Sequence, residues 1–327
     1  MNINFLVKAN RQTGLGHIIR SLALADEFKA RGHSCCFFTN VEAAKRIEAA
    51  GHSYCLTVNP PAELSKAPIW VVDLPLGIPL SIAQALRDKC AVLAVLNGAG
   101  HPDGDPGRLL ADLVFYQGCT LNPYALSWDG FEGEWFEGAH WLILRDEFKA
   151  SERRNAAPVH SHVTITGGGS DPKDITSKAI AALLGKGLEL RVIIGPSYQG
   201  NWPNFSDYVE LVFNPPSMAD ELSWADAAII SYGMTTFECL ALGIPTIALS
   251  ISPDHVASAQ LVQERSGGAL HSLGEVEQVT AEDICSAVKD ALDHREELSQ
   301  KARAFIDGRG AERVADKILE TAIFPQD

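Results

Sequence analysis

A histidine and an arginine follow a pair of glycines near the amino terminus. Residues 13–28 read TGLGHIIRSLALADEF, in which Gly14 and Gly16 flank an expected strand-to-helix turn. Because residues three apart share a helix face, His17 and Arg20 are expected to point the same way. The positive helix end and Arg20 both disfavour imidazolium, which leaves a neutral imidazole able to accept a proton. The pattern predicts a general base at His17; an exposed polar first turn is the alternative.

A run of three glycines follows a later strand. Residues 162–175 read HVTITGGGSDPKDI, where Ser170 or Asp171 can cap a helix that has Pro172 at its first position. Backbone N–H groups beside a helix N-terminus form a cradle for anions, so this loop is expected to hold a phosphate. No Gly-Lys-Ser/Thr sequence follows, which excludes a Walker loop. A well-capped strand–turn–helix joint is the alternative, although capping alone does not require three glycines.

The third candidate is the segment 231–247, which reads SYGMTTFECLALGIPTI. Ser231 is expected to end a strand, Gly233 to form the turn and Thr235 to begin a helix. The carboxylate of Glu238 could accept hydrogen bonds from both hydroxyls of a ribose. Alternatively, Thr235 and Glu238 form a capping box, in which the carboxylate bonds back to the Thr235 N–H. The local sequence leaves both roles open.

These segments need a scaffold that places strand ends and helix starts together. Strands and helices alternate in both halves, with a helix expected over residues 16–30, and short connections in such alternation imply parallel sheets. We predict an α/β protein of two Rossmann-like domains, 1–150 and 161–327, joined by a polar linker at 151–160. The last helix could pack back on the first domain. Ligands of open α/β sheets bind at the carboxyl ends of strands, so a central cleft is the expected site.

One aromatic segment and one histidine pair have less regular patterns. Residues 128–141, WDGFEGEWFEGAHW, carry four acidic residues among aromatic ones. We expect an exposed loop with a few anchoring rings, and a lid over the cleft is the alternative. His160 and His162 lie two residues apart beside the linker, where they are more often incidental than metal ligands.

Composition excludes several classes of protein. The chain has 327 residues and a formal net charge of −14, which disfavours nucleic acid and anionic membranes as partners. Its apolar stretches fall short of the ~20 residues that span a bilayer. The amino terminus lacks the features of a signal peptide, so we expect a cytoplasmic protein without stable membrane insertion. Seven cysteines without a CxxC pair predict neither a zinc site nor a disulfide framework.

Together the three segments resemble the nucleotide-sugar enzymes of the MurG-like GT-B group, whose C-terminal half binds UDP. The glycine-rich loop is followed by NPPSMADELSWADAAI and then by the TTFE segment that ends in LGIP. The resemblance implies that the backbone near Phe213 and Met218 contacts the uracil and that Glu238 contacts the ribose. The resemblance also implies that nine residues surround the diphosphate: Gly14, Gly16, Gly168, Gly169, Ser170, Ser231, Gly233, Met234 and Thr235.

Within that group the sequence is similar to the PseG family of UDP-2,4-diacetamido-2,4,6-trideoxy-β-L-altropyranose hydrolases. The likeness covers nearly the whole chain: a G-x-G-H-x-x-R pattern at 14–20, LILRDEF at 142–148, GGGSDP at 167–172 and IDGRGAERV at 306–314. It implies hydrolysis of a UDP-activated deoxyaminosugar in pseudaminic-type nonulosonic acid or surface polysaccharide biosynthesis. His17 would position or deprotonate the attacking water, with Arg20 as the second catalytic residue.

The same resemblance assigns sugar contacts to Asn10, Asp73 and Asn97, in a half whose neighbouring residues depart from the family pattern. Two other activities stay open. A glycosyltransferase of the same fold would pass the sugar to an acceptor, although no strong basic amphipathic helix suggests a lipid-linked one. The other alternative is a nucleotide-sugar binding protein without catalytic activity, and the presence of His17 and Arg20 argues against it. No cofactor and no metal ion is expected, because turn amides and helix ends would stabilise the diphosphate.

Overall fold

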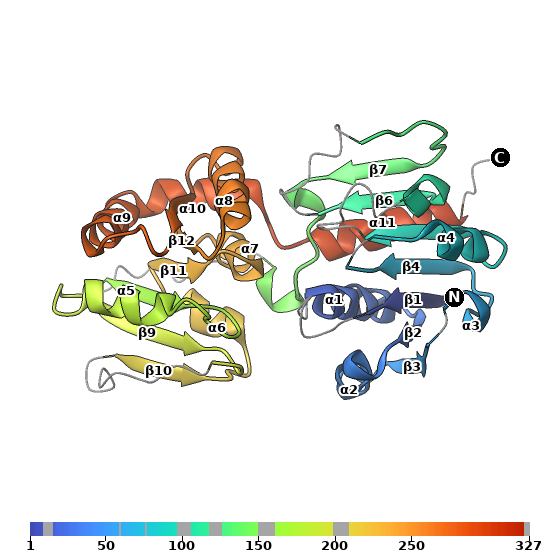
Figure 1. The fold of residues 1–327 in the computed structure, drawn as a ribbon, viewed down its shortest axis with the longest axis horizontal. Helices are drawn as coiled ribbons and strands as arrows, with labels where there is room; N and C mark the ends of the chain where they lie inside the picture. Colours follow the sequence, from blue (N-terminus) through green and yellow to red (C-terminus); the bar gives the residue numbers. More distant parts are fainter. Residues whose placement is uncertain are drawn as a thin grey trace. The chain divides into compact units, whose positions relative to one another are not determined.

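The computed structural model describes residues 1–8, 16–58, 60–75, 77–96, 106–117, 126–149, 161–198 and 209–323. The chain divides into a first unit, residues 1–146 with 309–327, and a second unit, residues 147–308. Each unit is an all-parallel sheet with helices on its faces (Figure 1). The predicted class, two Rossmann-like parallel-sheet domains, is therefore confirmed. The predicted linker, 151–160, lies outside the described residues.

Seven strands form the sheet of the first unit, in the order β3-β2-β1-β4-β5-β6-β7. They are β1 (Asn2–Val7), β2 (Ser34–Thr39), β3 (Ser53–Leu56), β4 (Ile69–Asp73), β5 (Val92–Leu96), β6 (Leu113–Tyr116) and β7 (Glu134–Glu137). The helices are α1 (Gly16–Ala30), α2 (Val41–Ala49), α3 (Pro60–Glu63), α4 (Leu80–Arg87) and α11 (Gly310–Ile323). Short 3₁₀ turns lie at Pro106–Leu110, Ala139–Trp141 and Asp146–Phe148.

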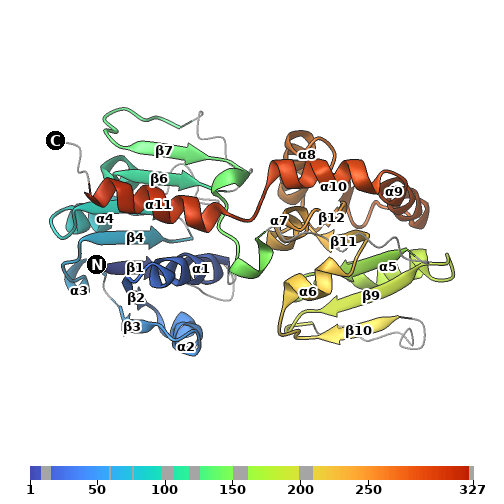
Figure 2. The same ribbon diagram turned by 180° about the vertical axis from the view of Figure 1, so that it is seen from behind.

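Alternate side chains of these strands fill two separate cores. Phe5 belongs to the core on the side of α1 and α11, whereas its neighbour Leu6 belongs to the core on the side of α4. This follows from the period of two in a strand, which sends successive side chains to opposite faces. Helices α1 and α11 pack together on the first face (Figure 2). The carboxy-terminal helix is thus part of the first unit.

Six strands form the sheet of the second unit, in the order β10-β9-β8-β11-β12-β13. They are β8 (His162–Thr166), β9 (Glu189–Ile194), β10 (Glu210–Phe213), β11 (Ala227–Ser231), β12 (Thr246–Ser250) and β13 (Leu270–Glu275). The helices are α5 (Ile175–Leu183), α6 (Met218–Ser223), α7 (Met234–Ala241), α8 (Pro253–Arg265), α9 (Ala281–Asp293) and α10 (Arg295–Phe305). Strands β3 and β13 were not expected from the sequence.

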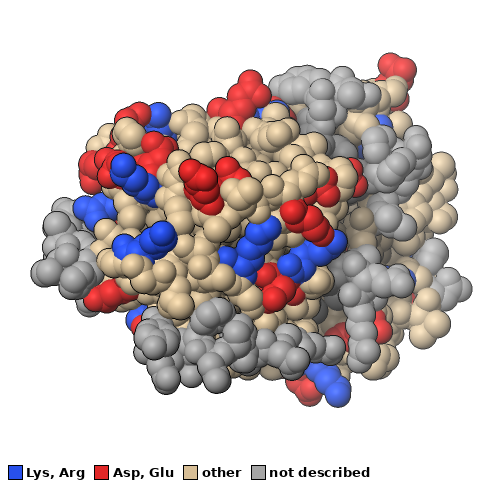
Figure 3. Space-filling view, turned by 60° about the vertical axis from the view of Figure 1, so that its left-hand side comes forward, with Lys and Arg blue, Asp and Glu red and all other residues tan. Residues whose placement is uncertain are grey.

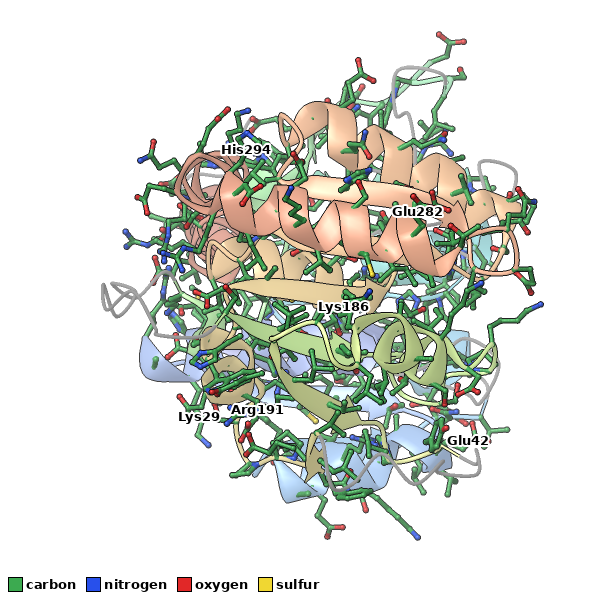
Figure 4. All side chains as sticks on the ribbon, turned by 90° about the vertical axis from the view of Figure 1, so that its left-hand side faces the viewer. Lys29, Glu42, Lys186, Arg191, Glu282 and His294 are labelled. Carbon is green, nitrogen blue, oxygen red and sulfur yellow. The ribbon has the colours of Figure 1, made fainter. Side chains whose placement is uncertain are left out.

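Polar and aromatic groups close the amino-terminal edge of this second sheet. The guanidinium of Arg191 (Figure 4) lies 4.3 Å from the ring centroid of Trp224 and pairs with Glu210 at 2.8 Å. The ring of His162 also stacks on the ring of Trp224, with the two ring centroids 4.2 Å apart. Because this edge is occupied by its own side chains, the carboxyl edge of the sheet is the better place for a ligand.

Strand β7 forms in the segment that we predicted to be an exposed loop. It pairs in parallel with β6, so residues 134–137 extend the first sheet. The rings of Trp128 and Trp135 stack with their centroids 5.3 Å apart, and those of Phe136 and Trp141 lie 4.5 Å apart. The loop prediction was wrong at this strand, because pairing with a strand distant in sequence stabilises it and leaves no local signal.

Helix α5 begins at Ile175, later than the start predicted at Pro172. Asp171 and Asp174 have left-handed backbone angles, with φ of 44° and 52°, which prevents helical geometry before that point. The carboxylate of Asp171 accepts the N–H groups of Ile175 at 2.8 Å and Thr176 at 2.9 Å. Asp171 therefore caps the helix, as expected, but from further upstream.

The final helical segment is two helices. Residues 295–323 form α10 and α11, and the chain passes from the second unit to the first between them. Among the described residues, no helix has the length and apolar character that crossing a membrane requires. Figure 3 shows acidic and basic side chains interspersed on one face, so the negative net charge does not form a single patch there.

Candidate functional site

His17 and Asp73 are in direct contact at the carboxyl end of the first sheet. Asp73 ends β4 and His17 lies in the first turn of α1. The distance from His17 Nδ1 to Asp73 Oδ1 is 2.6 Å. The side chain of Asp73 is 1% exposed, whereas that of His17 is 16% exposed. Arg20 Nη2 also lies 2.9 Å from His17 Nδ1. An ionised carboxylate can only accept hydrogen bonds, so the contact with Asp73 is a hydrogen bond in the tautomer that carries the proton on Nδ1 and the lone pair on Nε2.

Asp73 is held as an anion by three side chains of α1. Arg20 donates from Nε to Oδ2 at 2.6 Å and from Nη2 to Oδ1, and Ser21 Oγ donates to Oδ2 at 3.1 Å. Burial alone would raise the pKa of Asp73, but the Arg20 guanidinium and the His17 imidazole lower that pKa to about 2. The carboxylate is therefore charged at neutral pH and fixes the tautomer of His17.

This geometry encloses Arg20, expected to be catalytic, and Asp73, expected to contact the sugar, beside His17. Arg20 is 8% exposed and Asp73 is fully buried, with both carboxylate oxygens bonded within the first unit. The ring of His17 and the guanidinium of Arg20 bond to the same carboxylate, so these two enclosed groups can position His17. The catalytic role of Arg20 and the sugar contact of Asp73 stay predictions. Ser21 was missed by sequence reasoning, because a serine in a helix carries no signal until its distant partner is known.

Three other predicted site residues lie outside the described residues. They are Asn10 and Asn97, expected at the sugar, and Gly14, expected at the diphosphate. Gly16 is described and begins α1. It has no left-handed φ, and a Cβ built on it would have nothing within 4 Å. The backbone at Gly16 therefore does not require glycine, and its contact with the diphosphate stays a prediction.

The glycine-rich loop after β8 is braced by the backbone of the β9 end. Gly168 has φ of +80°, and its N–H donates to Thr166 Oγ1 at 3.2 Å. A Cβ built on Gly195 would lie 2.2 Å from the Gly168 carbonyl oxygen, and Ser197 N–H donates to Gly169 O at 2.9 Å. Gly169 and Ser170 are exposed at the tip. The Gly168 amide is thus engaged internally, and the exposed tip is the part that could contact a phosphate.

The turn before α7 is capped differently from the predicted capping box. Gly233 is the N-cap, and its N–H donates to Thr236 Oγ1 at 3.2 Å. Thr235 lies inside the helix, so the alternative in which Thr235 begins a capping box with Glu238 does not hold. Ser231 ends β11 as expected. Glu238 is 8% exposed, and the ribose role stays a prediction for it.

The residues expected at the uracil lie around the end of β10 and the start of α6. Phe213 ends β10 with 58% of its surface exposed, and Met218 begins α6. Ser217 Oγ accepts the Asp220 N–H at 3.1 Å and donates to Glu147 Oε2 at 2.8 Å. Glu147 was quoted in the sequence only within a motif, and the structure shows that it secures this turn.

These second-unit segments share one edge of the sheet. Strands β8, β10 and β11 run parallel, so the glycine-rich loop, Phe213 and Ser231 all follow carboxyl ends. Helix α7 starts beside them, and its first turn carries a partial positive charge. Met234 and Thr235 form that first turn. Such an edge suits a phosphorylated ligand.

Solved structures with this arrangement belong to the GT-B class of glycosyltransferases, whose fold this chain has. MurG of Acinetobacter baumannii matches with a TM-score of 0.65 at 16% identity, over 98% of this chain and 99% of that one. The calicheamicin glycosyltransferase CalG4 matches with a TM-score of 0.64 at 16% identity, over 98% of both chains. The spinosyn rhamnosyltransferase SpnG, complexed with thymidine diphosphate, matches with a TM-score of 0.60 at 14% identity, over 97% and 100%.

Two relatives are similar to this chain in sequence. The spore coat polysaccharide biosynthesis protein SpsG of Bacillus subtilis is 23% identical over 359 aligned positions, covering 96% of each chain. An uncharacterized protein of Methanocaldococcus jannaschii, MJ1062, is 28% identical over 274 residues, covering 76% of this chain. The match spans only 55% of the length of that archaeal protein. No protein-family model matches the chain.

Proposed function

We propose that this chain transfers a glycosyl group from a uridine diphosphate sugar to a hydroxyl acceptor during glycan assembly. The observation that carries the proposal is the 2.6 Å contact between His17 Nδ1 and the buried, ionised Asp73. This contact leaves Nε2 of His17 as a proton acceptor on a partly exposed ring. A hydroxyl becomes a competent nucleophile when such a base takes its proton.

The proposed reaction is one displacement. The acceptor O–H gives its proton to His17 Nε2 while its oxygen bonds to the anomeric carbon. The bond from that carbon to the diphosphate oxygen breaks, and UDP leaves with the electron pair. The Asp73 carboxylate stabilises the imidazolium that forms, as a buried carboxylate does in a catalytic triad. Within the second unit, the Gly169–Ser170 tip and the first turn of α7 are the groups that we propose for the diphosphate.

The nucleotide part of the proposal rests on the second unit. Phe213 offers an exposed ring beside the turn that Glu147 and Ser217 secure, which suits a flat base. Glu238 would accept the ribose hydroxyls, in keeping with the GT-B resemblance of its segment. Glycosyltransferases recur among the structures that share this fold, and one sequence relative is named for polysaccharide biosynthesis. These likenesses favour a sugar-transferring enzyme.

Hydrolysis is the second candidate, with water in place of the acceptor. The observation that favours it is the set of PseG-like motifs, of which the G-x-G-H-x-x-R pattern contains His17 and Arg20. The substrate would then be a UDP-activated deoxyaminosugar in a nonulosonic acid pathway. The same base would serve, because water and a sugar hydroxyl lose a proton in the same way.

One assay separates these reactions. The protein is incubated with a panel of UDP-sugars, with and without saccharide acceptors, and UDP release is measured alongside mass spectrometry of the products. UDP release that requires an acceptor, with a glycosylated product, supports transfer. Free sugar and UDP formed without an acceptor support hydrolysis. If calorimetry detects no binding of UDP or of any UDP-sugar, both proposals fail.

A further inference from the structure

A small cavity opens on the face of the first sheet opposite α1. Its volume is about 330 Å³, and its walls include Asn4 of β1, Cys36 of β2, Cys55 of β3 and Ser65. The carboxamide of Asn4 donates to Ser65 Oγ at 3.1 Å, which fixes one wall. His17 belongs to α1 on the other face, so this cavity has no part in the proposed glycosyl chemistry.

Two thiols lie next to each other in this cavity. In the pairing of β2 with β3, Cys36 lies opposite Ser53 and Phe38 lies opposite Cys55. Because side chains two residues apart share a face, Cys36 and Cys55 are diagonal neighbours on one face. Both are free thiols, with Cys55 exposed and Cys36 partly exposed. The pair is therefore accessible to a solute.

A pair of free thiols in a cavity can serve a metal ion, because an ion that binds sulfur displaces the thiol proton.

The strand geometry favours an ion between the sulfurs over a bond joining them. Neighbouring strands are about 4.8 Å apart and two residues advance about 6.6 Å, so diagonal Cα atoms are separated by about 8 Å. A disulfide requires roughly 4.4–6.8 Å between its Cα atoms. Two metal–sulfur bonds of about 2.3 Å instead span up to about 4.6 Å between sulfurs. A bridging ion thus tolerates a wider separation of the two cysteines than a disulfide does.

We propose that Cys36 and Cys55 form a two-thiolate site for a soft monovalent metal ion of the Cu(I) class. Each sulfur bonds to the ion as its thiol releases one proton to solvent, and the oxidation state of the ion is unchanged. Among the described residues, no group of three or more His, Cys, Asp or Glu side chains is placed to hold a metal. Two sulfur ligands are too few for a structural zinc site but match the preference of Cu(I) for thiolates.

The test uses Cu(I) itself, under anaerobic conditions, in competition with a chromophoric Cu(I) chelator. The unmodified protein is expected to withdraw one equivalent more from the chelator than the Cys55→Ser and Cys36→Ser variants do. Cys35→Ser is the matched control, because Cys35 adjoins Cys36 in the chain but packs against the core on the opposite face. It is expected to bind Cu(I) as the unmodified protein does.

Three results would overturn the proposal. One is unchanged Cu(I) binding by Cys55→Ser, whose exposed position lets the variant fold even if Cys36→Ser does not. Another is a Cys36–Cys55 disulfide, formed with diamide and found by peptide mass spectrometry, which would make the pair a redox couple. The third is a higher affinity of the same two cysteines for Zn(II) than for Cu(I). UDP binding, measured on the same variants, is expected to be unchanged.

Discussion

Arg20 and Asp73 form a two-point ion pair that joins α1 to β4, with Arg20 Nε 2.6 Å from Asp73 Oδ2. Paired N–H···O bonds fix the relative orientation of the two groups as well as attracting them. His17 lies one turn before Arg20 on the same helix, and its ring bonds to the same carboxylate. The ion pair therefore positions the proposed base.

Replacement of His17 by asparagine is expected to lower kcat by roughly 10²–10⁴-fold, the usual contribution of a general base. The Kd for UDP is expected to stay unchanged, because the nucleotide contacts are proposed for the second unit. Steady-state kinetics and titration calorimetry measure the two quantities. His33→Asn is the control, since His33 lies beyond the other end of α1. A tenfold loss of UDP affinity in His17→Asn would contradict the proposed role.

The pH dependence of unfolding reports on Asp73. Its pKa in the folded protein, about 2, lies below the ordinary value of 3.8. The ionised form is thus favoured by folding, which contributes about 2 kcal/mol above pH ~4 that is lost as the pH falls toward 2. Urea unfolding at pH 6 and pH 3 is expected to show about half of this loss, roughly 1 kcal/mol, because pH 3 lies between the two pKa values.

Replacement of Asp73 by asparagine tests the same carboxylate. The variant is expected to lose about 3–5 kcal/mol at pH 6, because Arg20 is left buried without its partner, and to lack the acid-dependent contribution of Asp73. The exposed Asp88→Asn is the control and should unfold like the unmodified protein. A variant Asp73→Asn as stable as its parent at pH 6 would refute the ion-pair assignment.

Glycine substitutions separate loop packing from ligand approach. Gly169 has no left-handed φ and nothing within 4 Å of a built Cβ, so Gly169→Ala is expected to change unfolding by less than about 0.5 kcal/mol. If the diphosphate approaches this tip, the same change should weaken UDP binding at least ~10-fold, or about 1.4 kcal/mol. Equal UDP affinity in Gly169→Ala would exclude a close contact there.

Gly195→Ala, at the end of β9 that packs against this loop, provides the contrast. Its added Cβ would meet the Gly168 carbonyl oxygen at 2.2 Å, and that oxygen belongs to backbone which cannot rotate away. Both thermal stability and UDP affinity are therefore expected to fall. Calorimetric unfolding and UDP titration of the two variants, side by side, check whether the loop is braced as described.

A comparison of UDP with 2′-deoxy-UDP, in the unmodified protein and in a variant, tests the ribose role of Glu238. If its carboxylate accepts the 2′-hydroxyl, the unmodified protein should prefer UDP to 2′-deoxy-UDP, and Glu238→Gln should lose most of that preference. The capping threonine supplies the control: Thr236→Val is expected to cost about 1 kcal/mol of stability while keeping the preference. A preference that survives in Glu238→Gln would assign the ribose to another group.

Local pattern was sufficient for the class of fold and for most elements. The helix expected over residues 16–30 is α1, Gly16–Ala30, because its start, its apolar spacing and its end are all encoded within the segment. Strands β4 and β5 are continuous apolar runs, as central parallel strands usually are, so the sequence alone indicates them as well. The helix start at 175 was misplaced, because the sequence does not show which aspartates adopt left-handed angles.

The sequence by itself therefore determined the alternation of strands and helices, the glycine-rich turns and the presence of a histidine at a helix start. Only the tertiary structure decided which distant residues contact each other. Asp73 meets His17 because β4 pairs with β1, and Cys55 meets Cys36 because β3 pairs with β2. Hydrogen bonds and periodicity within a helix or strand act over a few residues and leave a local signature. Strand order depends on contacts between distant segments, and no short stretch of sequence records them.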